Sequence, residues 1–351
     1  MKNIFKINLQ LFALTSNGVN ATVASGSMGA LDKGVYAAPN ADLSAEMKTF
    51  YDMTLIDEAS ANLVHDQFGQ KRPIPKGSGK TIEFRKFSPL DKATTPLTEG
   101  VTPSGKSLKV TAVTATVEQY GDYIVQSDVL ELTSLDNTIL EATKLLGKQA
   151  GATLDTITRN VLQATTSVTY CPKVDADGTE TEVTSRTALD ETCMLTVDVI
   201  QQVVAKLRAQ NAPTIDGKYV AIIHPYVAYD IMRDPEWIDA HKYAQPNNLY
   251  AGEIGEIAGV RFVQTTEAKI YDGGVFGSLF FGEGAYGVTE ITGGGLQTIV
   301  KQKGSAGTAD PLDQRSSVGW KAIKTAELLI PNYIVRVESK SKRFSATAVA
   351  N

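Results

Sequence analysis

Residues 75–128 read PKGSGKTIEFRKFSPLDKATTPLTEGVTPSGKSLKVTAVTATVEQYGDYIVQSD, and two β-prone runs flank a polar middle there that is rich in proline and glycine. The first run, Thr81–Phe87, alternates apolar and polar side chains, as a half-buried strand does. The second run, Leu108–Val125, is dense in β-branched residues, which favour strands. The stretch therefore predicts a long β-hairpin.

The second run changes its apolar face partway along. Leu108 and Val110 point to one side, whereas Val113, Ala115 and Val117 point to the other, because strand side chains alternate. A strand of this kind meets two different surfaces. About fifteen residues of ribbon reach roughly 50 Å, and a hairpin alone in water is only marginally stable. We infer that this hairpin lies on another molecule.

A long amphipathic helix is predicted directly after the hairpin, at Asn137–Gln163, with a length of about 40 Å. Ser134 or Asp136 can cap its N-terminus. Gly147 and Gly151 each weaken the helix by up to about 1 kcal/mol relative to alanine. The apolar stripe, spaced by three and four residues, consists of Ile139, Ala142, Leu146, Ala150, Leu154, Ile157 and Val161.

Composition limits the function classes. The 351 residues are enough for two subdomains with a real core, and 42% hydrophobic and 21% charged residues are ordinary for a globular protein. A formal net charge of −5 argues against a protein whose main task is to grip phosphate backbones. Cys171 and Cys193 lack CxxC spacing and fit a reducing cytosol.

The N-terminal segment, residues 1–42, is dominated by small and polar residues and predicts an extended arm. We find neither the apolar core of a secretory signal nor an apolar run of membrane-spanning length. Leu43–Phe68 then shows a helical pattern with Gly69 as its stop. Pro73 and Pro75 prevent its continuation and lead into the hairpin.

The second half of the chain predicts an α/β module. Tyr170–Asp190 is expected to form a surface turn or short hairpin, and Thr196 to cap a helix. Lys218–His224 is a short buried strand, and Pro225 opens another helix. Further strands are expected in Gly252–Gln264, on both sides of Gly282–Gly284 within Gly274–Ile291, and at Leu296–Lys301, Val318–Ala326 and Tyr333–Ser339.

We find no pattern of catalytic or metal-binding chemistry. The three histidines lack HExxH spacing, and the glycine-rich pieces match neither a Walker loop nor a dinucleotide fingerprint. Asp175–Gly178 resembles the start of a calcium loop, but the twelve-residue pattern fails. Asp234–Trp237 offers two carboxylates, yet a helix junction anchored by Trp237 explains the segment better. The sequence therefore predicts no catalytic residue, no cofactor and no metal.

Several segments carry a family resemblance. They are Leu63–Phe87 (LVHDQFGQKRPIPKGSGKTIEFRKF), Thr95–Gly100 (TPLTEG), Glu118–Tyr123 (EQYGDY), Gly252–Thr265 (GEIGEIAGVRFVQT), Phe281–Gly287 (FGEGAYG) and Asp310–Lys321 (DPLDQRSSVGWK). Through them, and in the expected order, the chain resembles the major capsid proteins of tailed bacteriophages. The branch is the one typified by the coat protein of the coliphage that carries its own virion RNA polymerase.

The resemblance implies an α+β fold with a peripheral β-sheet domain and an α/β axial domain. By position it implies an N-terminal arm (1–42), a helix and connector (43–75), an extended hairpin loop over the neighbouring subunit (76–128), a peripheral domain with a spine helix (129–190), an axial domain (191–295), and C-terminal strands returning to the peripheral domain (296–351).

The implied function is that of a structural subunit which self-assembles through hexamers and pentamers into an icosahedral shell around a double-stranded DNA genome. Subunit-contact candidates are Arg85, Lys86, Asp91, Lys92 and Glu99, which would set register rather than affinity. Hinge candidates are Gly121, Gly77 and Gly79.

Implied partners are further copies of the chain, with portal, scaffolding and decoration proteins, and packaged DNA bound without sequence specificity; no membrane is implied. The place of action would be the virion, after assembly in the bacterial cytoplasm. Two alternatives remain from the sequence. One is an encapsulin-like nanocompartment shell of the same fold, and the other is a soluble enzyme with an unrecognised site.

Overall fold

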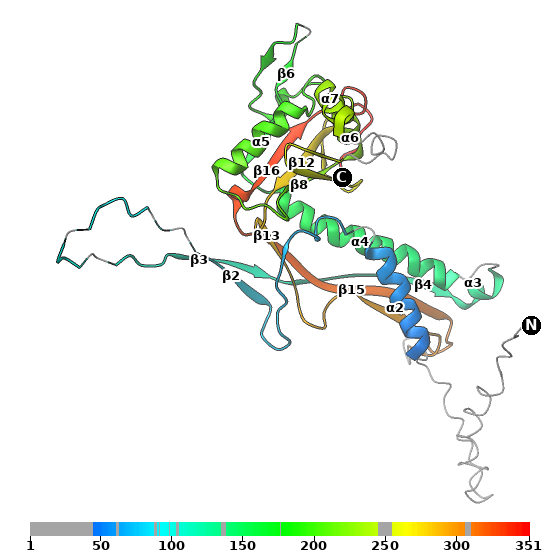
Figure 1. Ribbon diagram of the computed structural model, residues 1–351. Helices are drawn as coiled ribbons and strands as arrows, with labels where there is room; N and C mark the ends of the chain where they lie inside the picture. Colours follow the sequence, from blue (N-terminus) through cyan, green and yellow to red (C-terminus); the bar gives the residue numbers. More distant parts are fainter. Residues whose placement is uncertain are drawn as a thin grey trace, which may run out of the picture.

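The computed structural model describes residues 45–60, 63–87, 90, 92–97, 99–102, 105–134, 138–175, 177–244, 255–305 and 310–351. Figure 1 shows a thin ribbon that leaves one side of a body built from two sheets. The expected arm at residues 1–42 lies outside the described residues. The helices are α2 (Ala45–Ser60), α3 (Asp128–Thr133), α4 (Thr138–Gln163), α5 (Val197–Ala209), α6 (Pro225–Met232) and α7 (Pro235–Ala244), with 3-10 turns η1 (Arg186–Ala188) and η3 (Pro331–Tyr333).

The described strands form two sheets and two short hairpins. One sheet contains β1 (Gln70–Lys71), β13 (Tyr286–Glu290), β15 (Arg315–Leu328), β14 (Gln297–Lys301) and β4 (Glu118–Ser127). The other contains β5 (Val168–Tyr170), β16 (Ile334–Ser339), β12 (Val275–Phe281), β8 (Tyr219–Ile223), β10 (Val260–Gln264), β9 (Glu256–Ile257) and β11 (Ile270–Tyr271). The hairpins pair β2 (Thr81–Phe87) with β3 (Val110–Thr116), and β6 (Lys173–Val174) with β7 (Glu180–Thr181).

The first sheet is organised around β15. Along one edge this strand pairs with β4 over ten residue pairs, and along the other it pairs with β14 and then β13, all antiparallel. Val318, Trp320 and Ala322 alternate with outward-facing residues and pack with Leu146 and Leu154 of α4. The long helix predicted from the sequence is confirmed, and it lies along this sheet (Figure 1).

Helix α4 is buried on two sides, because α2 crosses its outer surface at two glycines. A side chain added at Gly147 would lie 2.9 Å from the carbonyl oxygen of Leu55, and one at Gly151 would lie 2.4 Å from that of Ala59. The two backbones are therefore in direct contact. The sequence reading of these glycines as weak points misses their purpose, which is close helix packing.

We expect Gly151→Ala to destabilise the protein by about 2 kcal/mol, although alanine is the better helix former. The reason is that its Cβ would collide with a main-chain oxygen of α2, which can move only if the whole helix moves. Thermal and urea unfolding of the unassembled chain measure the effect. Lys148→Ala, at a side chain 61% exposed on the same helix, is the control and should stay within about 0.5 kcal/mol. Equal stability of Gly151→Ala and wild type would contradict the packing argument.

The helix expected at Leu43–Phe68 is shorter than predicted. Helix α2 ends at Ser60, and the chain from Leu63 on forms turns instead. The reason is a competing acceptor, because the backbone N–H groups of Val64 and His65 donate to the buried Asp155 carboxylate of α4 rather than to helical carbonyls.

The second sheet confirms the predicted α/β module. All five residues of β8 are buried. The Thr196 hydroxyl accepts from the backbone N–H of Val199 at the start of α5, and Pro225 occupies the first turn of α6. The segment Tyr170–Asp190 contains the short β6–β7 hairpin, as predicted.

Two strands differ from the expected division of the chain. The family resemblance implies that the strands of residues 296–351 return to the peripheral domain. Strands β14 and β15 lie together in the first sheet, whereas β16 pairs with β12 and β5 in the second sheet. Five of its six residues are buried, and it has a partner strand along each edge, so it lies inside the second sheet. Strand β13 lies in the range expected for the axial domain (191–295), but it joins the first sheet. There the Tyr286 hydroxyl donates to the carbonyl oxygen of His65.

Candidate functional site

The β2–β3 ribbon has a root that belongs to the body. The two strands pair from Thr81 opposite Thr116 to Phe87 opposite Val110. At the root, the Phe84 ring is buried, and a side chain added at Gly287 of β13 would come within 2.8 Å of it. The root is therefore packed on the first sheet of its own chain.

Beyond the root, the ribbon has no core of its own. Every described side chain from Leu90 to Val110 is exposed. The large apolar ones are Leu90 (58% exposed), Leu97 (79%), Val101 (62%), Leu108 (67%) and Val110 (48%). The predicted change of face is confirmed, since Ala115 and Val117 on the same run are buried. Apolar side chains gathered on an outstretched segment indicate a contact surface for another molecule.

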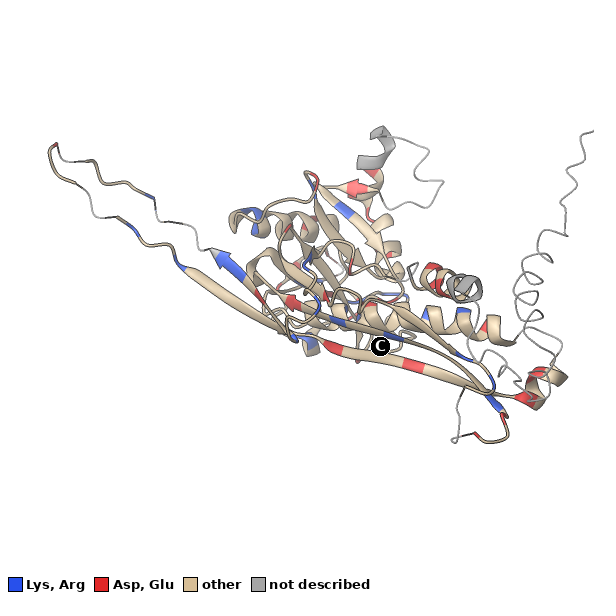
Figure 2. Cartoon of the chain, turned by 90° about the horizontal axis from the view of Figure 1, so that it is seen from below, with Lys and Arg blue, Asp and Glu red and all other residues tan. Residues whose placement is uncertain are grey.

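The predicted contact residues are distributed along this ribbon. Arg85 pairs with Glu83 of its own strand at 3.3 Å, with both side chains largely exposed. Lys86 is half-buried, and Lys92 and Glu99 are exposed in the distal part. Figure 2 shows several Lys and Arg residues along the ribbon. Asp91 lies outside the described residues. A contact with another copy stays a prediction for all five candidates.

The hinge candidates fall in two settings. Gly77 and Gly79 have φ of +88° and +89° in the exposed connector before β2, and a Cβ added at either position would meet open space. Gly121 lies inside β4 opposite Lys321, where a Cβ would sit 2.6 Å from the Trp320 carbonyl oxygen. Gly121 thus serves the close approach of β4 to β15, and hinge motion at any of the three stays a prediction.

A buried carboxylate fixes the connector that leads into the ribbon. Asp155 of α4 is fully buried and accepts from Val64 N at 2.9 Å and from His65 N at 2.7 Å. Its second oxygen lies 2.7 Å from Nδ1 of the buried His65 ring. Sequence reasoning missed this pair. The available signal was an aspartate one turn after Gly151, on the second buried side of the helix.

A buried ion pair lies beside it. The Lys324 ammonium of β15 contacts the Asp66 carboxylate and also donates to the carbonyl oxygen of Leu154 at 3.0 Å. Thr158 donates to the other Asp66 oxygen at 2.6 Å. Burial lowers the pKa of Lys324 from its ordinary value, and the Asp66 charge acts in the opposite direction. These contacts tie the connector to both the helix and the sheet.

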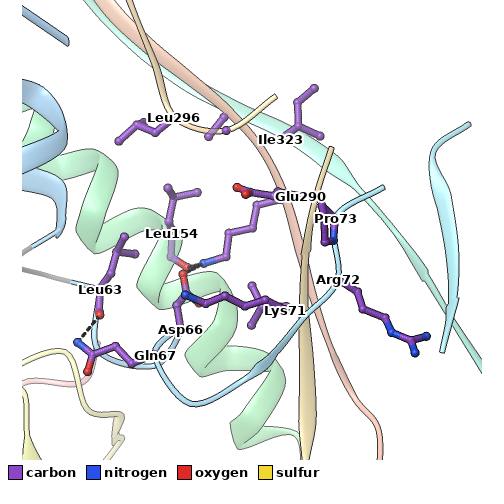
Figure 3. A pocket seen from close by; sticks show the side chains of 14 residues that line it. Leu63, Asp66, Gln67, Lys71, Arg72, Pro73, Leu154, Glu290, Leu296 and Ile323 are labelled. Atoms are coloured by element: carbon purple, nitrogen blue, oxygen red, sulfur yellow. Dashed lines mark hydrogen bonds and ion pairs between the residues drawn. The ribbon is translucent and has the colours of Figure 1, made fainter. Parts of the chain in front are cut away.

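The ion pair borders a cavity of about 480 Å³. Figure 3 shows Asp66, Gln67, Leu154 and Glu290 around it, and its lining comes from α4, from the connector before β2 and from the first sheet. Its lining combines apolar side chains with the paired Asp66 and Lys324. The cavity therefore borders the contacts that hold the connector before the ribbon.

The other polar candidates are structural. In the described parts of the chain, no group of three or more His, Cys, Asp or Glu side chains could hold a metal ion. Among the same residues, no helix is both long and apolar enough to cross a bilayer. His224 Nδ1 accepts from Tyr226 N at 3.1 Å. Asp234 accepts from Glu236 N and Val197 N, and Trp237 beside it is buried.

The geometry therefore defines a subunit with an outstretched arm rooted in its own body, and the described residues show no grouping of side chains for catalysis or metal binding. Residues 45–277 match the family model described as phage capsid protein, and the chain belongs to this family. Membership makes it a shell-forming structural protein of the virion capsid and not an enzyme, and it favours a phage capsid over the nanocompartment alternative. No curated protein sequence matches the chain.

Solved structures agree at the level of the fold. The capsid of the cyanophage P-SCSP1u is 14% identical with a TM-score of 0.60, covering 80% of this chain and 88% of that one. The capsid of Ralstonia phage GP4 is 13% identical with a TM-score of 0.60, covering 80% and 89%. The mature capsid of bacteriophage PhiM1 is 13% identical with a TM-score of 0.55, covering 78% and 86%. The α+β tailed-phage capsid fold expected from the sequence is thereby confirmed.

Proposed function

We propose that this chain is a major capsid protein that builds an icosahedral phage head through rings of five and six. One observation carries the proposal, namely that the ribbon beyond Phe87 exposes five large apolar side chains and buries none among its described residues. Such a segment gains stability only by covering another molecule.

Further copies of the same chain supply that molecule. A contact between two different patches of identical subunits is head-to-tail, and it closes into a ring when its rotation divides a full turn. We propose that the sheet around β15 with α4 forms the peripheral part of each subunit, and that the sheet around β12 forms the axial part near the ring centre. Gly77 and Gly79 would adjust the ribbon between rings of five and six.

The shell gains its durability from repetition. A standard protein interface buries about 1,600 Å². Each subunit in a ring takes part in at least two interfaces, because its own ribbon contacts one neighbour and the ribbon of the other neighbour contacts it. The contacts of the connector with Asp155 and Lys324 hold the ribbon in one direction relative to the body while the contact between subunits forms.

The remaining proposed partners follow from the function of a shell that encloses a genome. We propose that portal, scaffolding and decoration proteins join the assembly in the bacterial cytoplasm, and that double-stranded DNA fills the shell without sequence-specific contacts. The net charge of −5 supports this, since a shell that bound DNA tightly would impede packing. We also propose membership in the branch typified by the coliphage with a virion RNA polymerase.

Expression of the full chain alone, followed by gel filtration and negative-stain microscopy, tests the function. We expect hollow particles or isolated rings of five and six. Addition of a co-expressed scaffolding protein should raise the yield of closed shells. A chain that stays monomeric at every concentration and salt condition, with and without scaffolding protein, would contradict the proposal.

A further inference from the structure

A hollow of about 330 Å³ lies beside α6, in the part of the molecule built around the second sheet. Its lining comes from the residues at the start of α5, from α6 and its C-terminal end, and from the segment that follows β16 (α5, α6 and β16 in Figure 1). Three exposed cations line it, Arg233, Lys342 and Arg343. Within the described residues, none of the three forms an ion pair with a carboxylate. The hollow therefore presents positive charge that the chain does not neutralise by direct contact.

The two carboxylates of the lining are engaged by the protein itself. Asp234 accepts from backbone N–H groups at the starts of α5 and α7, at 2.9 Å and 3.0 Å. Burial raises the pKa of the Asp230 carboxyl group, whereas a hydrogen bond with Ser341 and the charge of Arg343 act in the opposite direction. Both carboxylates are only partly exposed. An anion that approaches the hollow therefore meets the exposed cations first.

A fixed turn presents two of the cations. The Ser345 hydroxyl accepts from the backbone N–H of Ser341 and donates to the Gly274 carbonyl oxygen, both at 2.8 Å. Gly274 has φ of +68°, and a side chain added there would come within 2.0 Å of the Ser345 carbonyl oxygen, so the two backbones are in direct contact. Lys342 and Arg343 thus extend from a backbone that is held on both sides, which lowers the entropy lost when they bind a ligand.

Aromatic packing brings the third cation to the same place. The Phe344 ring meets the Tyr229 ring edge-on, with 5.5 Å between the ring centres. The guanidinium groups of Arg233 and Arg343 lie 5.7 Å and 5.8 Å from the centre of the Tyr229 ring, and Arg233 also donates to the Tyr229 hydroxyl at 3.2 Å. Two like charges held beside one ring repel each other, and an anion placed between them offsets this repulsion.

We propose that Arg233, Lys342 and Arg343 form a phosphate-binding site, and that its ligand is the phosphodiester backbone of the double-stranded DNA inside the shell. The inference rests on the proposed function, since a shell around a genome brings DNA to every copy. Arginine and lysine are principal donors to DNA phosphates, and such contacts carry no sequence information. The site therefore gives the sequence-independent DNA contact a defined place on the chain.

The exposure of the three cations favours a polymer over a free phosphate ion. A site for a small ligand buries most of the ligand surface, whereas here every cation stands at the surface. Three phosphate contacts give weak binding, near the weak end of about 10⁻⁴ M for non-specific complexes. Such a site is occupied where DNA is concentrated and does not impede packing. The net charge of −5 does not prevent it, because salt screens distant charges beyond about 10 Å at 0.1 M.

Removal of the three charges tests the site. The site variant carries Arg233→Gln, Lys342→Gln and Arg343→Gln. The control variant removes two exposed arginines and one exposed lysine elsewhere on the chain, through Arg208→Gln, Arg261→Gln and Lys148→Gln. Fluorescence anisotropy of a labelled short DNA duplex measures binding to the unassembled full chain, and circular dichroism checks folding.

We expect the affinity of the wild type for the duplex to fall about 40-fold between about 50 mM and about 200 mM salt, as three phosphate contacts predict. At the lower salt concentration the site variant should bind at least about tenfold more weakly, and its salt slope should be smaller by about 1 for each cation removed. The control should stay within about threefold of the wild type. Equal losses in the two variants overturn the site, because binding would then follow net charge alone.

Two further outcomes reassign the cations. If inorganic phosphate displaces the duplex at an equal concentration of phosphate groups, the ligand is a free phosphate and the assignment to DNA is wrong. If the site variant binds the duplex as the wild type does but no longer forms particles, the cations serve a contact between copies, and the DNA site is likewise wrong.

Acetylation of lysines tests the site inside the particle. Mass spectrometry of the peptides should show that Lys342 reacts more slowly in DNA-filled heads than in empty shells, and that the difference grows as salt falls. Lys148 should react at the same rate in both. Equal reactivity of Lys342 in filled and empty particles overturns the proposal, while the particles themselves uphold the shell-building function.

Discussion

Closing the ribbon short, by replacing residues 88–109 with Asn-Gly, should abolish particle formation while the chain still folds. Phe87 and Val110 face each other across the β2–β3 pair, so a two-residue type I′ turn can join them directly. The removed segment has no buried side chain among its described residues, and we expect the unfolding free energy to change by less than about 1 kcal/mol. Gel filtration and negative-stain microscopy should show monomers in place of particles.

The matched control shortens a different exposed hairpin. Replacing residues 175–179 with Asn-Gly trims the loop between β6 and β7, and shells should still form. If the chain with the short ribbon also builds closed shells, the exposed apolar side chains of the ribbon have no part in assembly, and the central argument for the function is lost.

Local patterns in the sequence were sufficient for most of the elements. Thr81–Phe87, the long helix ending at Gln163 and the cap at Thr196 are recovered because each depends on side-chain periodicity or on one hydrogen bond nearby in the chain. The change of apolar face along residues 108–117 also has a local signature, and it is what points to an arm outside the core.

Partners that are distant in the chain explain why some elements of the structure differ from the sequence prediction. Helix α2 ends early because Asp155, some ninety residues away, takes the Val64 and His65 amide groups. Strand β16 leaves its sequence neighbours because its apolar residues fill both faces of the second sheet. Neither partner is visible in a local window, since a lone aspartate on a helix and an apolar strand are each compatible with several neighbours.

The residues of the candidate site could likewise be predicted from the sequence only in part. The exposed contact residues could be proposed because the distal part of the ribbon is polar and rich in turn-forming residues. The family resemblance then implied that this segment contacts a neighbouring subunit. The network at its root could not, because the Asp66–Lys324 pair joins positions 258 residues apart and each residue alone resembles an ordinary surface charge.

The buried carboxylate at the root gives the largest expected change in stability. Asp155→Ala should destabilise the chain by about 3–5 kcal/mol, because two backbone N–H groups and the His65 ring would lose their acceptor inside the protein. Chemical denaturation of the unassembled chain measures this. Hydrogen exchange at Val64 and His65 should rise at the same time, since both amides depend on the carboxylate.

Asp155→Asn separates charge from hydrogen bonding. Its amide oxygen can still accept from both backbone groups, and its NH₂ can donate to His65 Nδ1, so the loss should stay below about 2 kcal/mol. A loss as large as that of alanine would show that the negative charge itself, rather than the set of acceptors, holds the connector. If neither substitution costs more than about 1 kcal/mol, the connector is fixed by its apolar packing, and the direction of the ribbon is set by the contact of Phe84 with the first sheet rather than by α4.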